Sequence, residues 1–313
     1  MVKLNEKFKG RDFICLNDFT ADEIYEMIDV ALALKAENKA GIPHPVLKGK
    51  TLGMIFTKSS TRTRVAFEVG MYQLGGYALF LSNRDIQIGR GESIKDTARV
   101  LSRMVDGIMI RTFSHQEVLD LAKYASVPVI NGLSDYLHPT QVLADLMTIK
   151  EHKGTIKGLK LAYIGDGNNV ANSLLIGGSK MGMQVAIASP KGYQPVPEIR
   201  ELAEQNAQVS GGSILIVEDP LEAAAGADVL YTDVWASMGQ EEESEIRRKA
   251  FAGYQINETV LKVAHPDAIV MHCLPAHCGE EITEEVMEGP QSVVYDEAEN
   301  RLHAHKAIMA LVM

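Results

Sequence analysis

Residues 58–64 of this chain combine hydroxyl and guanidinium groups in a pattern that suits a phosphate. The stretch reads Lys-Ser-Ser-Thr-Arg-Thr-Arg, and it lies between a short apolar run at 51–56 and a helical pattern at 61–74. The free N–H groups and the dipole of a helix N-terminus favour an anion there, and arginine adds a planar fork of donors. Arg62 and Arg64 point about 200° apart around a helix, so they cannot both face one ligand. We predict that Arg62 binds the anion and that Arg64 forms a structural ion pair.

Further polar residues follow the other apolar runs of the first half. Gln87 lies in a loop, Arg111 ends a run at 107–111, and residues 138–141 read His-Pro-Thr-Gln. A histidine and an amide could polarise a carbonyl group by stabilising charge that develops on its oxygen. Each feature also has an ordinary interpretation, as a surface arginine or as a helix N-cap with an incidental histidine. Their common placement after strands favours a site.

The second half contains a glycine-rich turn that has to be weighed as a dinucleotide motif. Residues 165–169 read Gly-Asp-Gly-Asn-Asn, but Val170 stands where the third glycine belongs. The next predicted strand, at 184–188, is followed by no acid to hold a ribose, so the pattern argues against NAD. Asn168 and Asn169 could instead bind a substrate carboxylate at the start of a helix.

Two more segments carry chemistry. Asp233 ends a strand, where its carboxylate could hold an ammonium group or simply cap a turn. Residues 272–278 read His-Cys-Leu-Pro-Ala-His-Cys, yet the spacing is not a usual zinc pattern, so we predict no metal. On a strand His272 would point away from Cys273 and could not act as its base. We therefore expect Cys273 to line a substrate site.

The elements that must position these residues alternate between strands and helices, which predicts parallel sheets covered by helices. The strands expected before a polar, glycine-marked boundary at 153–158 are 51–56, 77–81, 107–111 and 127–130. Those expected after it are 159–164, 184–188, 213–217, 229–233, 268–272 and 292–295. We predict an α/β protein of two domains, 1–150 and 151–296, with a last helix at 297–313. Ligands bind outside the carboxyl ends of such strands, so the active site is expected in the cleft between the domains.

Composition limits the class of protein. The chain has 313 residues, 46% of them hydrophobic, and a net charge of −10, which argues against a nucleic-acid partner. It shows no signal peptide and no apolar run that could cross a membrane. Three cysteines fit a reduced compartment, so we expect a cytoplasmic protein.

Four segments together resemble the transcarbamoylase family over nearly the whole chain. Residues 60–64 and 138–141 are similar to motifs of the family in general. Asp233 with the Ser-Met-Gly of 237–239, and the His-Cys-Leu-Pro of 272–275, resemble the members that act on ornithine rather than on aspartate, acetylornithine or putrescine. The resemblance implies trimers or multiples of trimers, no cofactor, and a last helix that packs on the first domain.

The resemblance also implies roles for residues. The carbamoyl phosphate site would comprise Ser60, Thr61, Arg62, Thr63, Gln87, Arg111, His138, Pro139, Thr140, Gln141, Cys273, Leu274 and Arg301, with Gln87 offered to a neighbouring subunit. The ornithine site would comprise Asn169, Asp233, Ser237 and Met238. Among these, Arg62, Arg111, His138 and Cys273 are the expected catalytic residues.

The implied reaction transfers the carbamoyl group of carbamoyl phosphate to the δ-amine of L-ornithine, giving L-citrulline and phosphate. Because the attacking amine must be neutral, we expect Asp233 to hold the α-ammonium instead, and we expect the departing phosphate to take the proton. The alternatives are a transcarbamoylase for another amine such as putrescine, a non-catalytic binder of a phosphorylated metabolite, and an NAD-dependent oxidoreductase.

Overall fold

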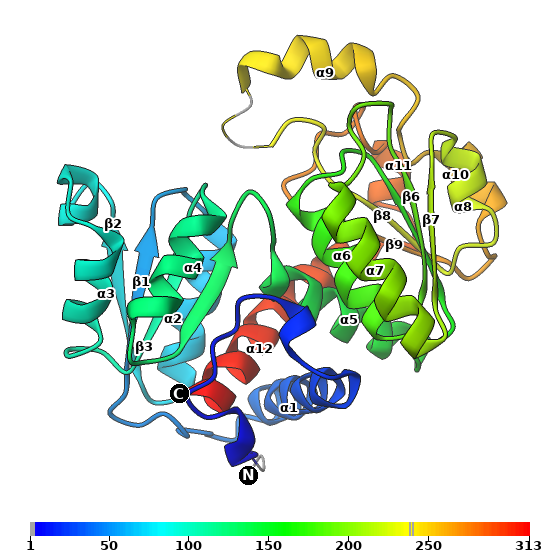
Figure 1. The fold of residues 1–313 in the computed structure, drawn as a ribbon. Helices are drawn as coiled ribbons and strands as arrows, with labels where there is room; N and C mark the ends of the chain where they lie inside the picture. The colour runs from blue at the N-terminus through cyan, green and yellow to red at the C-terminus, as the bar shows by residue number, and fades with distance from the viewer. Residues whose placement is uncertain (1–3, 238, 240) are drawn as a thin grey trace. The chain divides into compact units, whose positions relative to one another are not determined.

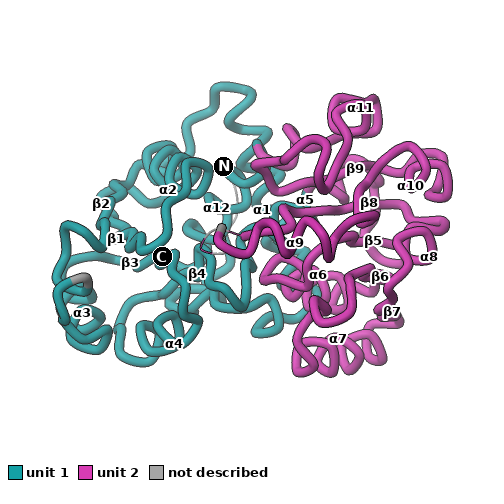
Figure 2. Tube along the Cα trace, turned by 90° about the horizontal axis from the view of Figure 1, so that it is seen from above, with its two compact units in different colours: residues 1–147, 299–313 teal, residues 148–298 magenta. Residues whose placement is uncertain are grey.

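The computed structural model describes residues 4–237, 239 and 241–313 (Figure 1). The chain divides into two compact units, 1–147 with 299–313 and 148–298 (Figure 2). Within the described residues, no helix combines the length and the apolar character needed to cross a membrane.

Unit 1 is built on a four-stranded parallel sheet in the order β2-β1-β3-β4. Buried strands β1 and β3 lie at its centre, as their continuous apolar runs predict. One face packs on α3 and α4 through a cluster that includes Ala98, Ile110 and Leu121. The elements of this unit are α1 (Ala21–Lys39), β1 (Thr51–Phe56), α2 (Thr61–Gln73), β2 (Tyr77–Ser82), α3 (Ile94–Leu101), β3 (Gly107–Arg111), α4 (His115–Tyr124) and β4 (Val129–Leu133), with short 3-10 helices at Glu6–Phe8, Leu16–Asp18 and Gln87–Arg90.

Unit 2 is built on a five-stranded parallel sheet in the order β7-β6-β5-β8-β9. Helices α6 and α7 pack together against β6 and β7, and the core cluster joins the sheet to α8, α10 and α11. The elements of this unit are β5 (Lys160–Ile164), α6 (Asn169–Lys180), β6 (Gln184–Ala188), α7 (Pro197–Ser210), β7 (Ser213–Val217), α8 (Pro220–Ala224), β8 (Val229–Thr232), α9 (Ser244–Ala250), α10 (Glu258–Val263), β9 (Ile269–His272) and α11 (Glu284–Met287), with a 3-10 helix at Glu241–Glu243. Both sheets have the predicted fold class, an α/β arrangement of parallel strands flanked by helices.

Two helices carry the chain from one unit to the other. They are α5 (Pro139–Lys153), in which unit 1 ends at Met147, and α12 (Val294–Val312), in which unit 1 resumes at Glu299. The strand predicted at 292–295 is wrong: only Ser292 forms an isolated bridge, with Val270, and helix α12 begins at Val294. The apolar run suggested a strand, but Asp296 and Glu297 in the first turn suit a helix N-terminus.

Candidate active site

The start of helix α2 has the geometry expected of an anion site. The Ser60 hydroxyl caps the helix by accepting from the backbone N–H of Thr63 at 3.2 Å. Arg64 pairs with Glu68 at 2.9 Å and stacks on the Phe80 ring, so the structural ion pair predicted for it is confirmed. Arg62, half-buried in the first turn, remains the predicted ligand of the anion.

Arg301 from helix α12 reaches this same helix start. Its Nη2 donates to the Thr63 hydroxyl at 2.7 Å, and both side chains are buried. Arg111 ends strand β3 and is 6% exposed. The structure therefore places a buried arginine from a distant part of the sequence beside the phosphate-type loop.

His138 is buried at 4% exposure, immediately before helix α5. Burial lowers the pKa of its imidazole well below the ordinary value, and the positive charges of Arg301 and Arg111 lower it further. Because these charges act on His138, the two arginines and the histidine share one electrostatic environment. A neutral imidazole keeps one N–H, which can polarise a carbonyl group.

The remaining residues predicted for unit 1 fall into two groups. Pro139, Thr140 and Gln141 are buried in the first turn of α5, and the Gln141 amide donates to Asp145 at 2.8 Å. Thr61 and Gln87 are exposed, Gln87 at the start of a 3-10 helix that follows β2. Among the described residues, no hydrogen bond or ion pair links the Gln87 side chain to His138 or to the helix start.

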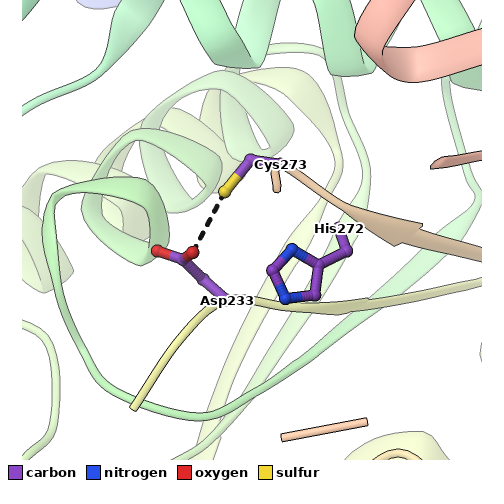
Figure 3. Close-up of side chains that lie close together, drawn as sticks. All are labelled: Asp233, His272 and Cys273. Atoms are coloured by element: carbon purple, nitrogen blue, oxygen red, sulfur yellow. Dashed lines mark hydrogen bonds between the residues drawn. The ribbon is translucent and has the colours of Figure 1, made fainter. Parts of the chain in front are cut away.

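Unit 2 gathers a second set of predicted residues at the ends of strands β8 and β9. The Cys273 thiol donates to Asp233 Oδ1 at 3.1 Å (Figure 3). The Asn168 amide donates to Asp233 Oδ2 at 2.8 Å. Asn168 also caps α6 by accepting from two backbone N–H groups, which commits it to local structure. Asn169, the first residue of α6, is 8% exposed.

His272 is buried and has a structural task. Its Nε2 lies 3.0 Å from Glu281 Oε1, and its Nδ1 accepts from the backbone N–H of Leu274 at 2.9 Å. The prediction that His272 points away from Cys273 is wrong: their ligand atoms and that of Asp233 all lie within 4.8 Å of one another, because strand β9 ends at His272 and its alternation of faces does not extend to Cys273. The three residues suggest a metal cluster, but both imidazole nitrogens are engaged in these hydrogen bonds. Leu274 has a φ of 58°, a left-handed conformation that this hydrogen bond helps to hold.

Two residues of this region were missed by sequence reasoning. Arg247 of α9 donates to Asp166 at 2.9 Å and to the Trp235 carbonyl at 3.0 Å, and both charged side chains are buried. Burial raises the pKa of Asp166 to about 6, against the opposing effect of Arg247. The pair fixes the turn after β8, which leads to the half-buried Ser237. Met238, predicted to bind ornithine, lies outside the described residues.

Comparison with known proteins agrees with this arrangement. Residues 11–151 match the family description "Aspartate/ornithine carbamoyltransferase, carbamoyl-P binding domain", and residues 157–312 match "Aspartate/ornithine carbamoyltransferase, Asp/Orn binding domain". The chain therefore belongs to the aspartate/ornithine carbamoyltransferase family.

Its relatives narrow the family to one branch. The chain is 62% identical to the ornithine carbamoyltransferase of Thermococcus kodakarensis, over 97% of this chain and 96% of that protein. It is 60% identical to the anabolic ornithine carbamoyltransferase of Pyrococcus furiosus, again over 97% and 96%. A solved ornithine carbamoyltransferase from P. furiosus superposes with a TM-score of 0.95 at 59% identity, covering 100% of this chain and 99% of that one. An anabolic enzyme from Campylobacter jejuni gives a TM-score of 0.90 at 47% identity, covering 96% and 97%. Within its family the chain thus groups with the ornithine carbamoyltransferases.

Proposed function

We propose that the protein transfers the carbamoyl group of carbamoyl phosphate to the δ-amine of L-ornithine, giving L-citrulline and phosphate. The observation that carries the proposal is a buried, neutral His138 in the field of Arg111 and Arg301, on the unit whose family description names carbamoyl phosphate. A relative described as anabolic supports a place in arginine biosynthesis. The same comparisons disfavour putrescine as the acceptor and a purely binding role.

The residues of unit 1 suit activation of the donor. Arg62, Arg111 and the hydroxyl-rich start of α2 would hold the phosphate and stabilise it as it departs. Arg301 would stand beside it through its bond to Thr63. His138 would donate a hydrogen bond to the carbamoyl oxygen, where negative charge develops during attack.

The residues of unit 2 suit an amino-acid acceptor. An alkylamine with a pKa of about 10.4 is neutral in roughly one molecule in 10³ at pH 7, a cost of about 4–5 kcal/mol. A carboxylate beside the attacking amine would raise that cost, so we assign Asp233 to the α-ammonium. Asn169, Ser237 and Met238 would complete the ornithine site, and Cys273 and Leu274 would line the reacting centre. The departing phosphate would accept the amine proton.

The quaternary structure also belongs to this proposal. The protein would form trimers or multiples of trimers, with Gln87 reaching a neighbouring subunit. Exposed apolar side chains of unit 1 support self-association, because Val65, Val69 and Tyr72 share one face of α2 and Tyr77 and Leu79 line one face of edge strand β2.

The cellular setting follows from the cysteines. A count of three cysteines in 313 residues is sparse and odd, which supports a reducing, cytoplasmic location. We propose no cofactor and no metal for the reaction, and small-molecule substrates as the only ligands of the site.

Citrulline formation from carbamoyl phosphate tests the proposal, with ornithine, putrescine and aspartate compared as acceptors. Product from ornithine alone is expected, and no product from ornithine would refute the assignment. Arg62→Ala should lower kcat/KM by roughly 10- to 100-fold, since hydrogen bonds to charged groups contribute about 1.5–3 kcal/mol. Arg64→Ala is the matched control, because Arg64 pairs with Glu68, and it should change kcat/KM little. Asp233→Ala should chiefly raise the KM for ornithine.

A further inference from the structure

A short chain of hydrogen bonds joins the ends of strands β1 and β3, just beyond the last residues that pair in the sheet. Phe56 and Arg111 form that last pair, and the Thr57 backbone N–H donates to the Arg111 carbonyl at 2.9 Å. One position further on, the Thr57 hydroxyl donates to the Thr112 hydroxyl at 2.9 Å. The two side chains therefore extend the contact between the strands to the point where both strands end.

The chain of hydrogen bonds continues to Glu117, in the first turn of helix α4. The Thr112 hydroxyl donates to the Glu117 carboxylate, and Thr112 is 1% exposed. A carboxylate only accepts hydrogen bonds and each hydroxyl has one proton, so the chain runs from Thr57 through Thr112 to Glu117. The other acceptor near the Thr57 hydroxyl, the Arg111 carbonyl, is more distant at 3.3 Å.

The local sequence gives Glu117 a different expected partner. Residues 114–117 read Ser-His-Gln-Glu, which is the pattern of a capping box, in which the serine and the glutamate each accept from a backbone N–H of the same helix start. In the structure the Ser114 side chain makes no cap hydrogen bond, and the Glu117 side chain accepts from Thr112 instead. Glu117 therefore links helix α4 to the end of strand β3.

The segment after β3 is also tied to the loops that follow β1 and β4. The Thr112 backbone N–H donates to the Leu133 carbonyl at 2.9 Å, and the Asp135 backbone N–H donates to the Phe113 carbonyl at 2.9 Å. Lys58, in the loop after β1, pairs with the Asp135 carboxylate at 2.9 Å. These contacts connect the three segments that lead to the residues predicted to bind carbamoyl phosphate.

We propose that Glu117 is a positioning residue, which acts through the two threonines to fix the loop after β1 against the end of β3 that carries Arg111. The inference rests on the proposed function, in which Arg62 and Arg111 hold the phosphate of carbamoyl phosphate from these two segments. Guanidinium groups bind a phosphate best when their donors are correctly oriented, and small displacements weaken such a site. Glu117 needs no contact with the substrate for this role.

Calorimetric titration of the full-length protein with carbamoyl phosphate, in the absence of ornithine, tests the positioning role. Thr112→Val removes the middle hydroxyl with little change in shape and should raise the dissociation constant roughly 5- to 50-fold, whereas Thr112→Ser should keep it near the wild-type value. Glu117→Ala should give a rise similar to that of Thr112→Val. Asp120→Ala is the matched control, because it removes a carboxylate of the same helix whose partner is Gln116, and it should leave the dissociation constant unchanged.

A double-mutant cycle separates this role from a loss of stability. Because the two residues belong to one chain of hydrogen bonds, Thr112→Val and Glu117→Ala together should raise the dissociation constant no more than either alone. At saturating carbamoyl phosphate, the KM for ornithine should stay near the wild-type value in each variant. Urea unfolding of the same variants measures stability independently.

Several results would overturn the role of Glu117. These are additive effects of the two substitutions on the dissociation constant, failure of Thr112→Ser to retain binding, or a lower free energy of unfolding with unchanged binding in Glu117→Ala. A wild type that binds carbamoyl phosphate but forms no citrulline would refute the proposed function, while the dissociation constants would still decide the role of Glu117. A wild type that binds no carbamoyl phosphate would refute both.

Discussion

Replacing Asp166 by asparagine removes a carboxylate that is only 7% exposed and contacts Arg247 at 2.9 Å. Asparagine has nearly the same shape and can still accept a hydrogen bond from the guanidinium. The change therefore deletes one titrating group and one buried charge, and little else. The effect of this substitution on the free energy of unfolding should depend on pH, because burial shifts the pKa of Asp166.

The sign and size of this change in the free energy of unfolding follow from the pKa of the Asp166 carboxyl. In the folded protein burial raises it from 3.8 to about 6, so the folded state binds the proton more tightly than the unfolded chain. The stabilisation that Asp166 contributes is complete below pH 3.8 and is lost as the pH rises through about 6. The difference between the folded and unfolded pKa values corresponds to roughly 3 kcal/mol of the free energy of unfolding. Between pH 4.5 and 7.5 the free energy of unfolding of Asp166→Asn, relative to the wild type, should therefore rise by about 2 kcal/mol.

Urea unfolding at several pH values measures this difference, with the protein concentration held constant because association alters apparent stability. Asp106→Asn is the matched control, since bonds from Lys50 and from the Thr51 backbone lower the pKa of Asp106 in the folded protein despite its partial burial. Its stabilising contribution is lost on acidification, so its pH trend should be opposite. A difference for Asp166→Asn that is flat, or that falls as the pH rises, would show that Arg247 outweighs burial and would refute the reasoning.

Three further predictions concern Thr63, the helix caps at Asn168 and Asn257, and Gly178. Thr63→Val leaves a buried arginine of α12 without its hydroxyl acceptor and should lower the free energy of unfolding by about 1–3 kcal/mol, whereas Thr63→Ser should cost less. Asn168→Ala and Asn257→Ala each remove a helix cap that accepts from two backbone N–H groups. Each should lower the free energy of unfolding, measured with urea, by about 1 kcal/mol. Only Asn168→Ala should also raise the KM for ornithine. Gly178→Ala places a Cβ 2.6 Å from a Val185 methyl and should cost roughly 1–3 kcal/mol, and a double mutant with Val185→Ala that shows no recovery would count against this account.

The two sheets could be predicted because their strands read as short apolar runs, and the central strands β1 and β3 are buried on both faces. The strand at 292–295 could not be excluded, since β-branched residues also begin a helix when acidic residues follow. Helix α1 was not foreseen, although Thr20 and Glu23 form a capping box that marks its start. Local patterns therefore identified the strands of the two sheets but gave one short apolar run the wrong type and left out helix α1.

In the candidate site, contacts between neighbours in sequence could be predicted, and contacts between distant residues could not. The ion pair of Arg64 was predictable because Glu68 is one helical turn away. The pairing of Arg247 with Asp166 joins residues 81 positions apart, and no local pattern marks it. Likewise the nearness of Arg301 to Thr63 came from the family resemblance, because the two are separated by 238 positions.

The discontinuous make-up of unit 1 has a consequence for how the chain folds as it leaves the ribosome. Unit 2 is one continuous segment, whereas unit 1 needs residues 299–313, most of them buried, to fill its core. At synthesis rates of about 5–20 residues per second, those residues follow residue 147 by roughly 8–30 seconds. The unit translated second can thus reach its native state first, and the nascent first half must wait with an open core. Chaperones that protect exposed apolar segments would be needed most during that interval.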